Sequence, residues 1–250
     1  MNIKIISVGP YEVNCAVVWG NAKQALVIDP GFDAADIEAV LKKNGLTVAA
    51  ILLTHGHADH INALAKLHAA HPAPIYLHAE DERWAFTAAN QIPPHYPIPT
   101  KPTTKILDPT NPPRPAGTPP VEGTDQTPLH GRGERNDVSA EALAKVEVMD
   151  GVGSNPWKIA DLNFQTLETP GHTPGCVCYW FKDESVCFTG DTLFKGSCGR
   201  TDLPGGDGRI LAQSLKKLGN LPPETRIIAG HGDESTIAHE LKTNFFLQSH

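Results

Sequence analysis

The 250-residue chain lacks several features that would place it in a special class of proteins. No stretch approaches the roughly 20 consecutive apolar residues that a transmembrane helix needs. No run of Lys and Arg suggests a surface for nucleic acid or membrane. The N-terminus, Met1–Ile6, is typical of a strand and lacks the apolar core of a signal peptide. We therefore expect a cytoplasmic protein that binds neither nucleic acid nor membrane.

The cysteines also exclude a class, because five is an odd number and argues against a disulfide framework. Cys176 and Cys178 fall inside a predicted strand, so we interpret them as core residues. The chain is 40% apolar and 20% charged, with a net charge of -7, as expected of a globular protein. One α/β domain over residues 1–250 fits this length, and the charge says little about the substrate.

Short apolar runs alternate with amphipathic segments along most of the chain. Asp33 is a predicted N-cap for a helix that Gly45 ends. The remaining predicted helices are Ile61–Ala70, Ala79–Ala88, Ala140–Ala144, Ile210–Leu218 and Thr236–Phe246. The predicted strands are Ile3–Val8, Cys15–Trp19, Gln24–Ile28, Val48–Leu53, Ile75–Leu77, Val146–Met149, Leu162–Leu167, Cys176–Phe181, Ser185–Phe188 and Arg226–Ala229.

A proline-rich segment interrupts this pattern over residues 91–145. Twelve of the 22 prolines lie between Pro93 and Pro128, with few apolar residues among them. Such a segment forms neither a regular helix nor a central strand. We interpret it as a surface insertion within the single domain, and a lid or a partner-binding arm is the alternative.

Four residues that commonly bind metals cluster directly after the predicted buried strand Val48–Leu53. The segment reads His55-Gly56-His57-Ala58-Asp59-His60. His55 and His57 are two apart in extended chain, so their imidazoles point to the same side. Asp59 and His60 begin the next helix and can turn toward a second position. This density of imidazole and carboxylate groups indicates a site for a cation such as Zn²⁺ or Fe.

Three distant residues complete the candidate site, and each follows a predicted strand beside glycine. They are His172 in Gly171-His172-Thr173, Asp191 after Gly190, and His231 between Gly230 and Gly232. The ends of strands are where side chains converge in α/β folds. We therefore expect these three residues to join the histidine cluster.

The complete set resembles the metallo-β-lactamase superfamily, and its glyoxalase II-like branch in particular. The resemblance rests on the HxHxDH motif and on three further stretches, Val27-Ile28-Asp29-Pro30-Gly31, Gly190-Asp191-Thr192-Leu193-Phe194 and Gly199–Asp207. It covers nearly the whole chain outside residues 90–145. Longer glyoxalase II enzymes have an additional C-terminal helical domain, for which the resemblance finds no counterpart here. It implies a four-layered αββα sandwich carrying the proline-rich insertion.

The resemblance also implies a role for each residue of the site. Asp191 would bridge two divalent ions, expected to be Zn²⁺ with Fe or Mn as alternatives. Asp29 would be the carboxylate that orients a ligand histidine, although it could equally serve only as a turn residue before Pro-Gly. The implied ligands of metal one are His55, His57 and His172, and those of metal two are Asp59, His60 and His231.

We expect a hydrolase for a small-molecule thioester of the hydroxyacylglutathione type. In this hypothesis a hydroxide that bridges the metals attacks the acyl carbonyl, with Asp59 and Asp191 as catalytic residues. The resemblance makes Arg200 the candidate contact for a substrate carboxylate, and Lys195 lies nearby. A loop-pinning role for Arg200 is equally consistent with the sequence.

One alternative activity uses a similar set of residues. Persulfide dioxygenases resemble this chain but hold a single Fe(II) with two His and one Asp. Here those ligands would be His57 or His55, together with His172 and Asp191. The Leu203–Asp207 continuation resembles the hydrolase branch more closely. β-Lactam hydrolysis is disfavoured because no secretion signal is visible, and a non-catalytic binding protein because all seven ligand positions are filled.

Overall fold

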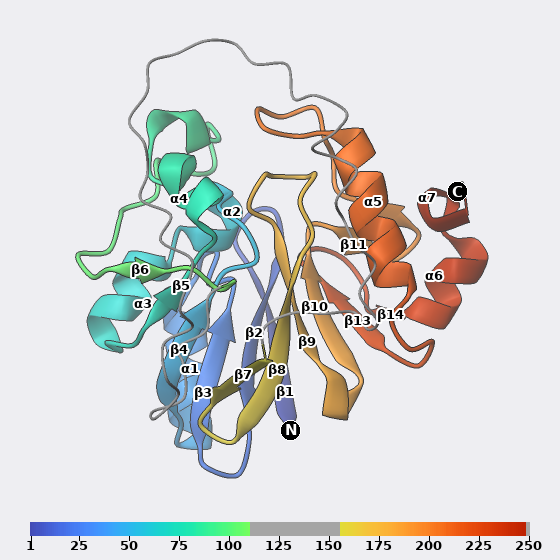
Figure 1. Ribbon diagram of the computed structural model, residues 1–250. Helices are drawn as coiled ribbons and strands as arrows, with labels where there is room; N and C mark the ends of the chain where they lie inside the picture. Colours follow the sequence, from blue (N-terminus) through green and yellow to red (C-terminus); the bar gives the residue numbers. More distant parts are fainter. Residues whose placement is uncertain (111–155, 249–250) are drawn as a thin grey trace, which may run out of the picture. The chain divides into compact units, whose positions relative to one another are not determined.

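The computed structural model describes residues 1–110 and 156–248, which contain two six-stranded sheets (Figure 1). The first sheet has its strands in sequence order: β1 (Asn2–Val8), β2 (Val13–Trp19), β3 (Gln24–Ile28), β4 (Thr47–Leu52), β5 (Ile75–Tyr76) and β6 (Ile106–Leu107). The second has the order β14 (Ser235–Thr236), β13 (Arg226–Ala229), β10 (Val186–Gly190), β9 (Val177–Phe181), β8 (Leu162–Glu168) and β7 (Pro156–Ile159). A small hairpin pairs β11 (Leu193–Phe194) with β12 (Ser197–Cys198).

Helices fill the connections that keep β3, β4 and β5 parallel, since parallel neighbours need a crossover. Helices α1, α3 and α4 lie beside the first sheet, and α5 and α6 beside the second (Figure 1). The helices are α1 (Ala34–Asn44), α2 (Ala58–Ile61), α3 (Leu64–Ala70), α4 (Ala79–Ala85), α5 (Gly208–Gly219), α6 (Ile237–Thr243) and α7 (Phe245–Gln248), with 3₁₀ turns η1 (Ala88–Asn90) and η2 (Lys182–Glu184). Within residues 1–110 and 156–248, no helix is both long and apolar enough to cross a membrane.

Side-chain alternation along the central strands produces two separate cores. On β2, Val17 packs with Ile37 and Leu41 of α1, whereas Val18 packs with residues of the second sheet such as Phe164 and Phe181. Successive strand residues point to opposite faces, so a strand buried on both faces has a continuous apolar run. The result is the predicted four-layered αββα sandwich, which is confirmed.

Three local predictions differ from the structure, each for a visible reason. The helix predicted over Thr236–Phe246 breaks at Asn244, whose side-chain amide donates to the Phe194 and Ser197 carbonyls. The helix predicted over Ile61–Ala70 is two helices, because the Ala63 N–H donates to Pro30 instead of continuing the helical ladder. Asp33 makes no side-chain cap, since its carboxylate accepts the Gly9 N–H at 2.8 Å.

The described part of the proline-rich segment packs on the domain. Tyr96 is buried, and β6 pairs with β5 at the edge of the first sheet, a position that tolerates neighbouring prolines. The helix predicted over Ala140–Ala144 and the strand over Val146–Met149 lie outside the described residues. So does the part of the insertion after residue 110, whose role stays a prediction.

Candidate metal centre

The candidate ligands lie at the ends of four strands. His55 follows β4, His172 follows β8, Asp191 follows β10 and His231 follows β13. Strands β8 and β10 are both antiparallel to β9, and β13 is parallel to β10, so these three strands end at the same edge of the second sheet. The two sheets pack face to face, which brings the end of β4 to the same place (Figure 1).

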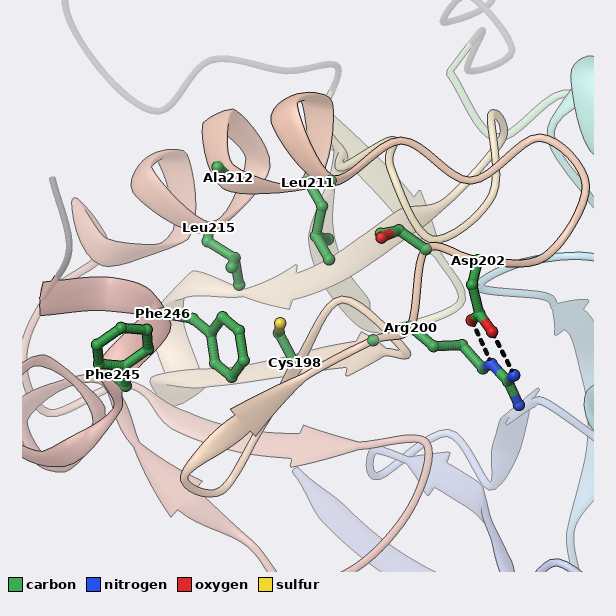
Figure 2. A pocket seen from close by; sticks show the side chains of 11 residues that line it. Cys198, Arg200, Asp202, Leu211, Ala212, Leu215, Phe245 and Phe246 are labelled. Carbon is green, nitrogen blue, oxygen red and sulfur yellow. Dashed lines mark hydrogen bonds and ion pairs between the residues drawn. The ribbon is translucent and has the colours of Figure 1, made fainter.

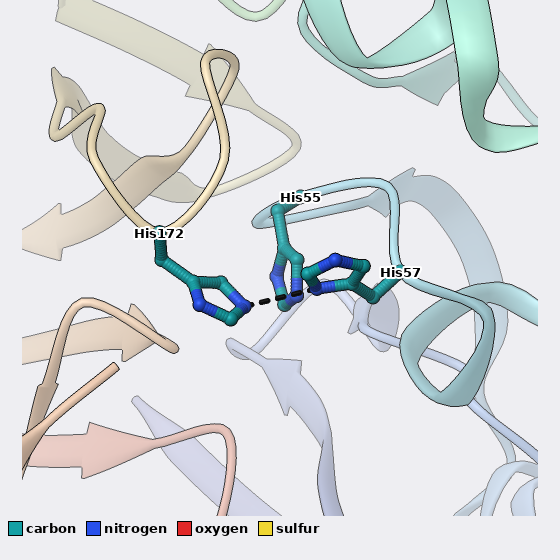
Figure 3. A group of neighbouring side chains, drawn as sticks. All are labelled: His55, His57 and His172. Atoms are coloured by element: carbon teal, nitrogen blue, oxygen red, sulfur yellow. Dashed lines mark hydrogen bonds between the residues drawn. The ribbon is translucent and has the colours of Figure 1, made fainter. Parts of the chain in front are cut away.

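All seven predicted ligands come together in the structure. Figure 3 shows the rings of His55, His57 and His172 converging, with His57 Nδ1 at 2.9 Å from His172 Nε2. His231 Nε2 lies 3.4 Å from an oxygen of Asp59. In each of three overlapping groups the ligand atoms lie within 4.8 Å of one another: His55, His57 and His172; His55, His60 and Asp191; and Asp59, His60 and His231.

Hydrogen bonds on the outer side of three rings determine which nitrogen faces the centre. In His172, His231 and His60 the Nδ1 atom meets an oxygen that accepts a hydrogen bond, so Nδ1 carries a hydrogen and Nε2 is the nitrogen that faces the centre. The bonds run from His172 to the Arg200 carbonyl at 2.7 Å, from His231 to the Tyr11 carbonyl at 2.8 Å, and from His60 to Asp29 Oδ2 at 3.1 Å.

Asp29 makes the contact that the family resemblance implies. Besides His60, its carboxylate accepts the Thr54 N–H and the Thr54 hydroxyl, both at 2.7 Å. Thr54 Oγ1 also lies 3.1 Å from His55 Nδ1. One buried carboxylate therefore orients His60 directly and His55 through Thr54, the kind of support that fixes ligand rings in metal sites.

The centre contains acceptors without matching donors, which is what a cation would satisfy. His55 Nε2 and Asp191 Oδ1 are buried and have no hydrogen-bond partner among the described residues. Buried polar atoms are normally paired, and an orphan in a ring of lone pairs and carboxylates indicates a missing positive charge. Imidazole nitrogens and carboxylate oxygens in this number fit divalent metal ions such as zinc or iron.

Electrostatics favour the metal-binding protonation states at one end of the centre. Burial, followed by the neighbouring His172, lowers the pKa of His57 to about 4. Burial and His60 likewise lower the pKa of His55 well below its usual range. Burial alone would raise the pKa of Asp191, but His60 outweighs it and holds that pKa below its usual range. Neutral rings and an ionised carboxylate are the forms that bind metal.

The other end of the centre attracts positive charge. Burial lowers the pKa of His60, but Asp191 and Asp59 outweigh it and raise that pKa well above its usual value. The pKa of His231 is also raised, because its bond to Asp59 outweighs the effect of burial. Both shifts favour a positive charge beside the carboxylates, a position that a divalent cation would take in place of protons.

Gly230 illustrates how closely the backbone approaches the ligands. A Cβ added there would lie 2.2 Å from Asp191 Oδ1 and 2.6 Å from His60 Cε1. Either contact would displace a ligand side chain, so only glycine fits before His231.

The two residues predicted to contact substrate lie outside the ligand cluster. The Arg200 guanidinium pairs with both carboxylate oxygens of Asp202 at 2.7 Å, and Lys195 Nζ lies 3.0 Å from Asp233. All four side chains are exposed. The Arg200 backbone holds His172, which places this residue beside the centre, while a substrate contact through either cation stays a prediction.

A pocket of about 560 Å³ adjoins this segment (Figure 2). Leu211 and Leu215 of α5 and Phe246 of α7 form apolar walls, and the Arg200–Asp202 pair lies at one end. This volume falls within the range of small-molecule sites. Arg200 lines the pocket and its carbonyl accepts from His172 Nδ1, so the pocket lies beside the backbone that holds this ligand.

Sequence reasoning missed three residues that support the centre. Thr54 links Asp29 to His55, and Tyr11 holds His231 through its backbone carbonyl. Asn90 accepts the Ala58 N–H at 3.0 Å and donates to the Gly56 carbonyl at 2.7 Å. A backbone carbonyl carries no side-chain signal, and Asn90 lies too far along the chain for its contacts to be inferred.

Comparison with known proteins identifies the family that this fold and centre define. The metallo-beta-lactamase superfamily profile matches residues 8–141 and 159–231, most of the chain. The chain therefore belongs to the metallo-beta-lactamase superfamily and is a metallo-hydrolase of that superfamily.

Individual relatives span the full length of the chain. The hydroxyacylglutathione hydrolase GloC of Haemophilus influenzae is 32% identical over 250 residues, covering 100% of this chain and 99% of GloC. The crystal structure of the BLEG-1 B3 metallo-beta-lactamase is 31% identical with a TM-score of 0.75, covering 98% of this chain and 99% of that one. The di-iron-bound form of TTHA1623 is 33% identical with a TM-score of 0.70, covering 98% and 100%.

Proposed function

We propose that the protein hydrolyses a small-molecule thioester of the hydroxyacylglutathione type at a dinuclear metal centre. The observation that carries the proposal is the pairing of two ligand groups, His55–His57–His172 and Asp59–His60–His231, around Asp191. Two divalent ions in these groups would act as Lewis acids and supply a nucleophilic water with a pKa near neutrality.

The chain's own residues have distinct parts in this reaction. Asp191 lies between the groups, with one oxygen 3.4 Å from His60 Nε2 and the other 3.6 Å from His172 Nε2. Asp59, held beside His231, is the carboxylate placed to accept a proton from the attacking water. A bond forms between the water oxygen and the acyl carbon, and the carbon–sulfur bond breaks. The thiol has a pKa of about 8.5, so the thiolate leaves without an acid catalyst.

Two observations support the thioester class. GloC covers the whole chain at 32% identity, so its substrate type is the natural first candidate. The pocket beside Arg200 provides about 560 Å³ for the acyl group or the thiol carrier. Arg200 would exchange its exposed partner Asp202 for a substrate carboxylate, because an exposed ion pair is weak.

The test begins with protein purified without added metal. We expect two divalent ions per chain and hydrolysis of S-lactoylglutathione that is lost on chelation and restored by metal. The matched assay follows oxygen uptake with glutathione persulfide. One iron per chain together with oxygen uptake would overturn the hydrolase proposal in favour of the persulfide dioxygenase.

β-Lactam hydrolysis is a second candidate, favoured by the likeness to BLEG-1 at 31% identity over nearly the full length of both chains. The same ligand groups would serve, since a β-lactam is also an acyl compound attacked by water. Turnover of a chromogenic cephalosporin above that of S-lactoylglutathione, at equal metal content, would reverse the order of the two candidates.

A further inference from the structure

Asp81 is a fully buried carboxylate that lies outside the ligand set. It sits on α4, and its hydrogen-bond partners among the described residues are two backbone N–H groups and one hydroxyl. Its oxygens accept three hydrogen bonds, from Gly56 N at 2.9 Å, Gly175 N at 2.8 Å and the Thr173 hydroxyl at 2.7 Å. Burial raises the pKa of Asp81, so ionising this carboxyl group has an electrostatic cost.

The three donors belong to the two loops that carry His55, His57 and His172, the ligands called group one below. Gly56 lies between His55 and His57, at the end of β4 in the first sheet. Thr173 and Gly175 follow His172, between β8 and β9 in the second sheet. Asp81 therefore bridges two loops from different sheets at the point where their rings must meet.

Both loops lie close against Asp81. A Cβ at Gly175 would lie 2.7 Å from the Asp81 carboxyl carbon, and one at Gly56 would lie 3.2 Å from Asp81 Cβ. Both loops approach the carboxylate through glycine, the residue that allows such contact. His57 and His172 are consequently held with their facing nitrogens 2.9 Å apart.

Asn90 provides a contrast within the same region. Its side chain bonds to Gly56, Ala58 and Ala85, all on the β4 side of the centre. It shapes the first loop without reaching the second. The side-chain link between the two loops runs through Asp81, beside the backbone bond from Val177 N to the Thr54 carbonyl at 2.8 Å.

We propose that Asp81 is a positioning residue that holds His172 against the His55–His57 pair and thereby sets the metal affinity of group one alone. The inference rests on the proposed metal centre and is independent of the substrate. Group two, formed by Asp59, His60 and His231, is supported by Asp29 and Tyr11, and neither of them bonds to Asp81 among the hydrogen bonds of the described residues.

Asparagine cannot replace Asp81, although it has the same shape. Each carboxylate oxygen accepts a backbone N–H, from Gly56 on one side and Gly175 on the other. In either orientation an asparagine amide would direct its NH₂ at one of these donors. Asp81→Asn therefore breaks the bridge without removing volume.

The experiment measures metal stoichiometry and affinity by chelator competition in Asp81→Asn. We expect one ion to remain tightly bound and the affinity for the other to fall by about 10- to 100-fold, as for other residues that support metal ligands. Glu240→Gln is the matched control. Glu240 is equally buried and accepts from Gly196 and Asn244 at 2.8 Å, so this variant should keep both ions.

Thr173→Val is the milder variant, because it removes one of the three bonds and keeps the shape. We expect an effect in the same direction but smaller, and this variant serves if Asp81→Asn does not fold. Two ions bound by both variants with wild-type affinity would overturn the positioning role. Equal loss of both ions from Asp81→Asn, with a melting temperature lowered by the same amount as that of Glu240→Gln, would also overturn it. Wild-type protein that binds fewer than two ions would instead refute the proposed dinuclear centre.

Discussion

The metal centre and the neighbouring Arg200 segment are built in different ways. At the centre, His60 is held on its outer side by Asp29 and lies entirely within the protein. In the Arg200 segment, the ion pair with Asp202 is mostly exposed, and Phe245 at the pocket is 71% exposed. Buried groups are tightly constrained by their partners, whereas exposed pairs rearrange at little cost. The candidate metal centre is therefore held rigidly beside an adaptable surface segment.

Removing Asp191 should produce the largest effect, because this carboxylate belongs to the centre and faces both metal groups. We expect Asp191→Ala to lose metal and turnover together, with activity reduced by at least about 10³-fold. Metal analysis and S-lactoylglutathione hydrolysis measure the two losses, with Asp233→Ala as an exposed control. An Asp191→Ala protein with two ions and full turnover would contradict the assignment.

Replacing Asp29 tests the orientation of the ligands rather than their presence. Asp29→Ala leaves the Thr54 N–H and hydroxyl without their acceptor, and His60 without its support. We expect a loss of about 1–3 kcal/mol in the free energy of unfolding for the unsatisfied buried donors. Metal affinity should fall by about 10- to 100-fold.

Denaturant titration measures the free energy of unfolding of Asp29→Ala, and chelator competition measures its metal affinity. The control is Asp161→Ala, since Asp161 also accepts a backbone N–H, from Ala22, but is exposed and remote from the ligands. Equal losses in the two variants would show that Asp29 is only a turn residue.

Filling the pocket should change substrate preference while leaving the centre intact. Ala212 lines the pocket on α5, so Ala212→Trp occupies space that a large acyl or thiol group needs. We expect kcat/KM for a bulky thioester to fall about tenfold, equivalent to about 1.4 kcal/mol. Metal content should be unchanged. Ala39→Trp, on the exposed side of α1, controls for the added ring, and identical kinetics in both variants would exclude the pocket from substrate binding.

Truncating the exposed cations should have the smallest effect. Arg200→Ala removes a surface ion pair, so the melting temperature should stay at its wild-type value. If Arg200 contacts a substrate carboxylate, KM rises by about three- to tenfold and kcat is unchanged, the pattern of lost uniform binding. Lys195→Ala is the neighbouring comparison. Wild-type KM values in both variants would leave these cations without a substrate role.

Much of the fold follows from local patterns in the sequence. The continuous apolar run Val48–Leu53 predicts a strand buried on both faces, and the residues from His55 to His60 have the spacing of metal ligands. Helix α5 also follows from a local pattern, because its buried leucines recur at helical spacing. The errors come from side chains with distant partners. Asn244 ends α6 because it bonds to the hairpin of β11 and β12, and Asp33 bonds to Gly9 instead of capping its helix.

The seven candidate ligands could be named from the sequence by itself, because four cluster directly after a predicted strand and the other three each follow a predicted strand beside glycine. Apolar periodicity, a local property, predicted an α/β domain, whereas the four-layered αββα sandwich was what the family resemblance implied. Only the tertiary structure decided which nitrogen of each ring faces the centre, and that Asp81 joins loops whose residues Gly56 and Thr173 are far apart in the chain. Hydrogen bonds of this kind depend on distances between chain segments, and no local pattern records those distances.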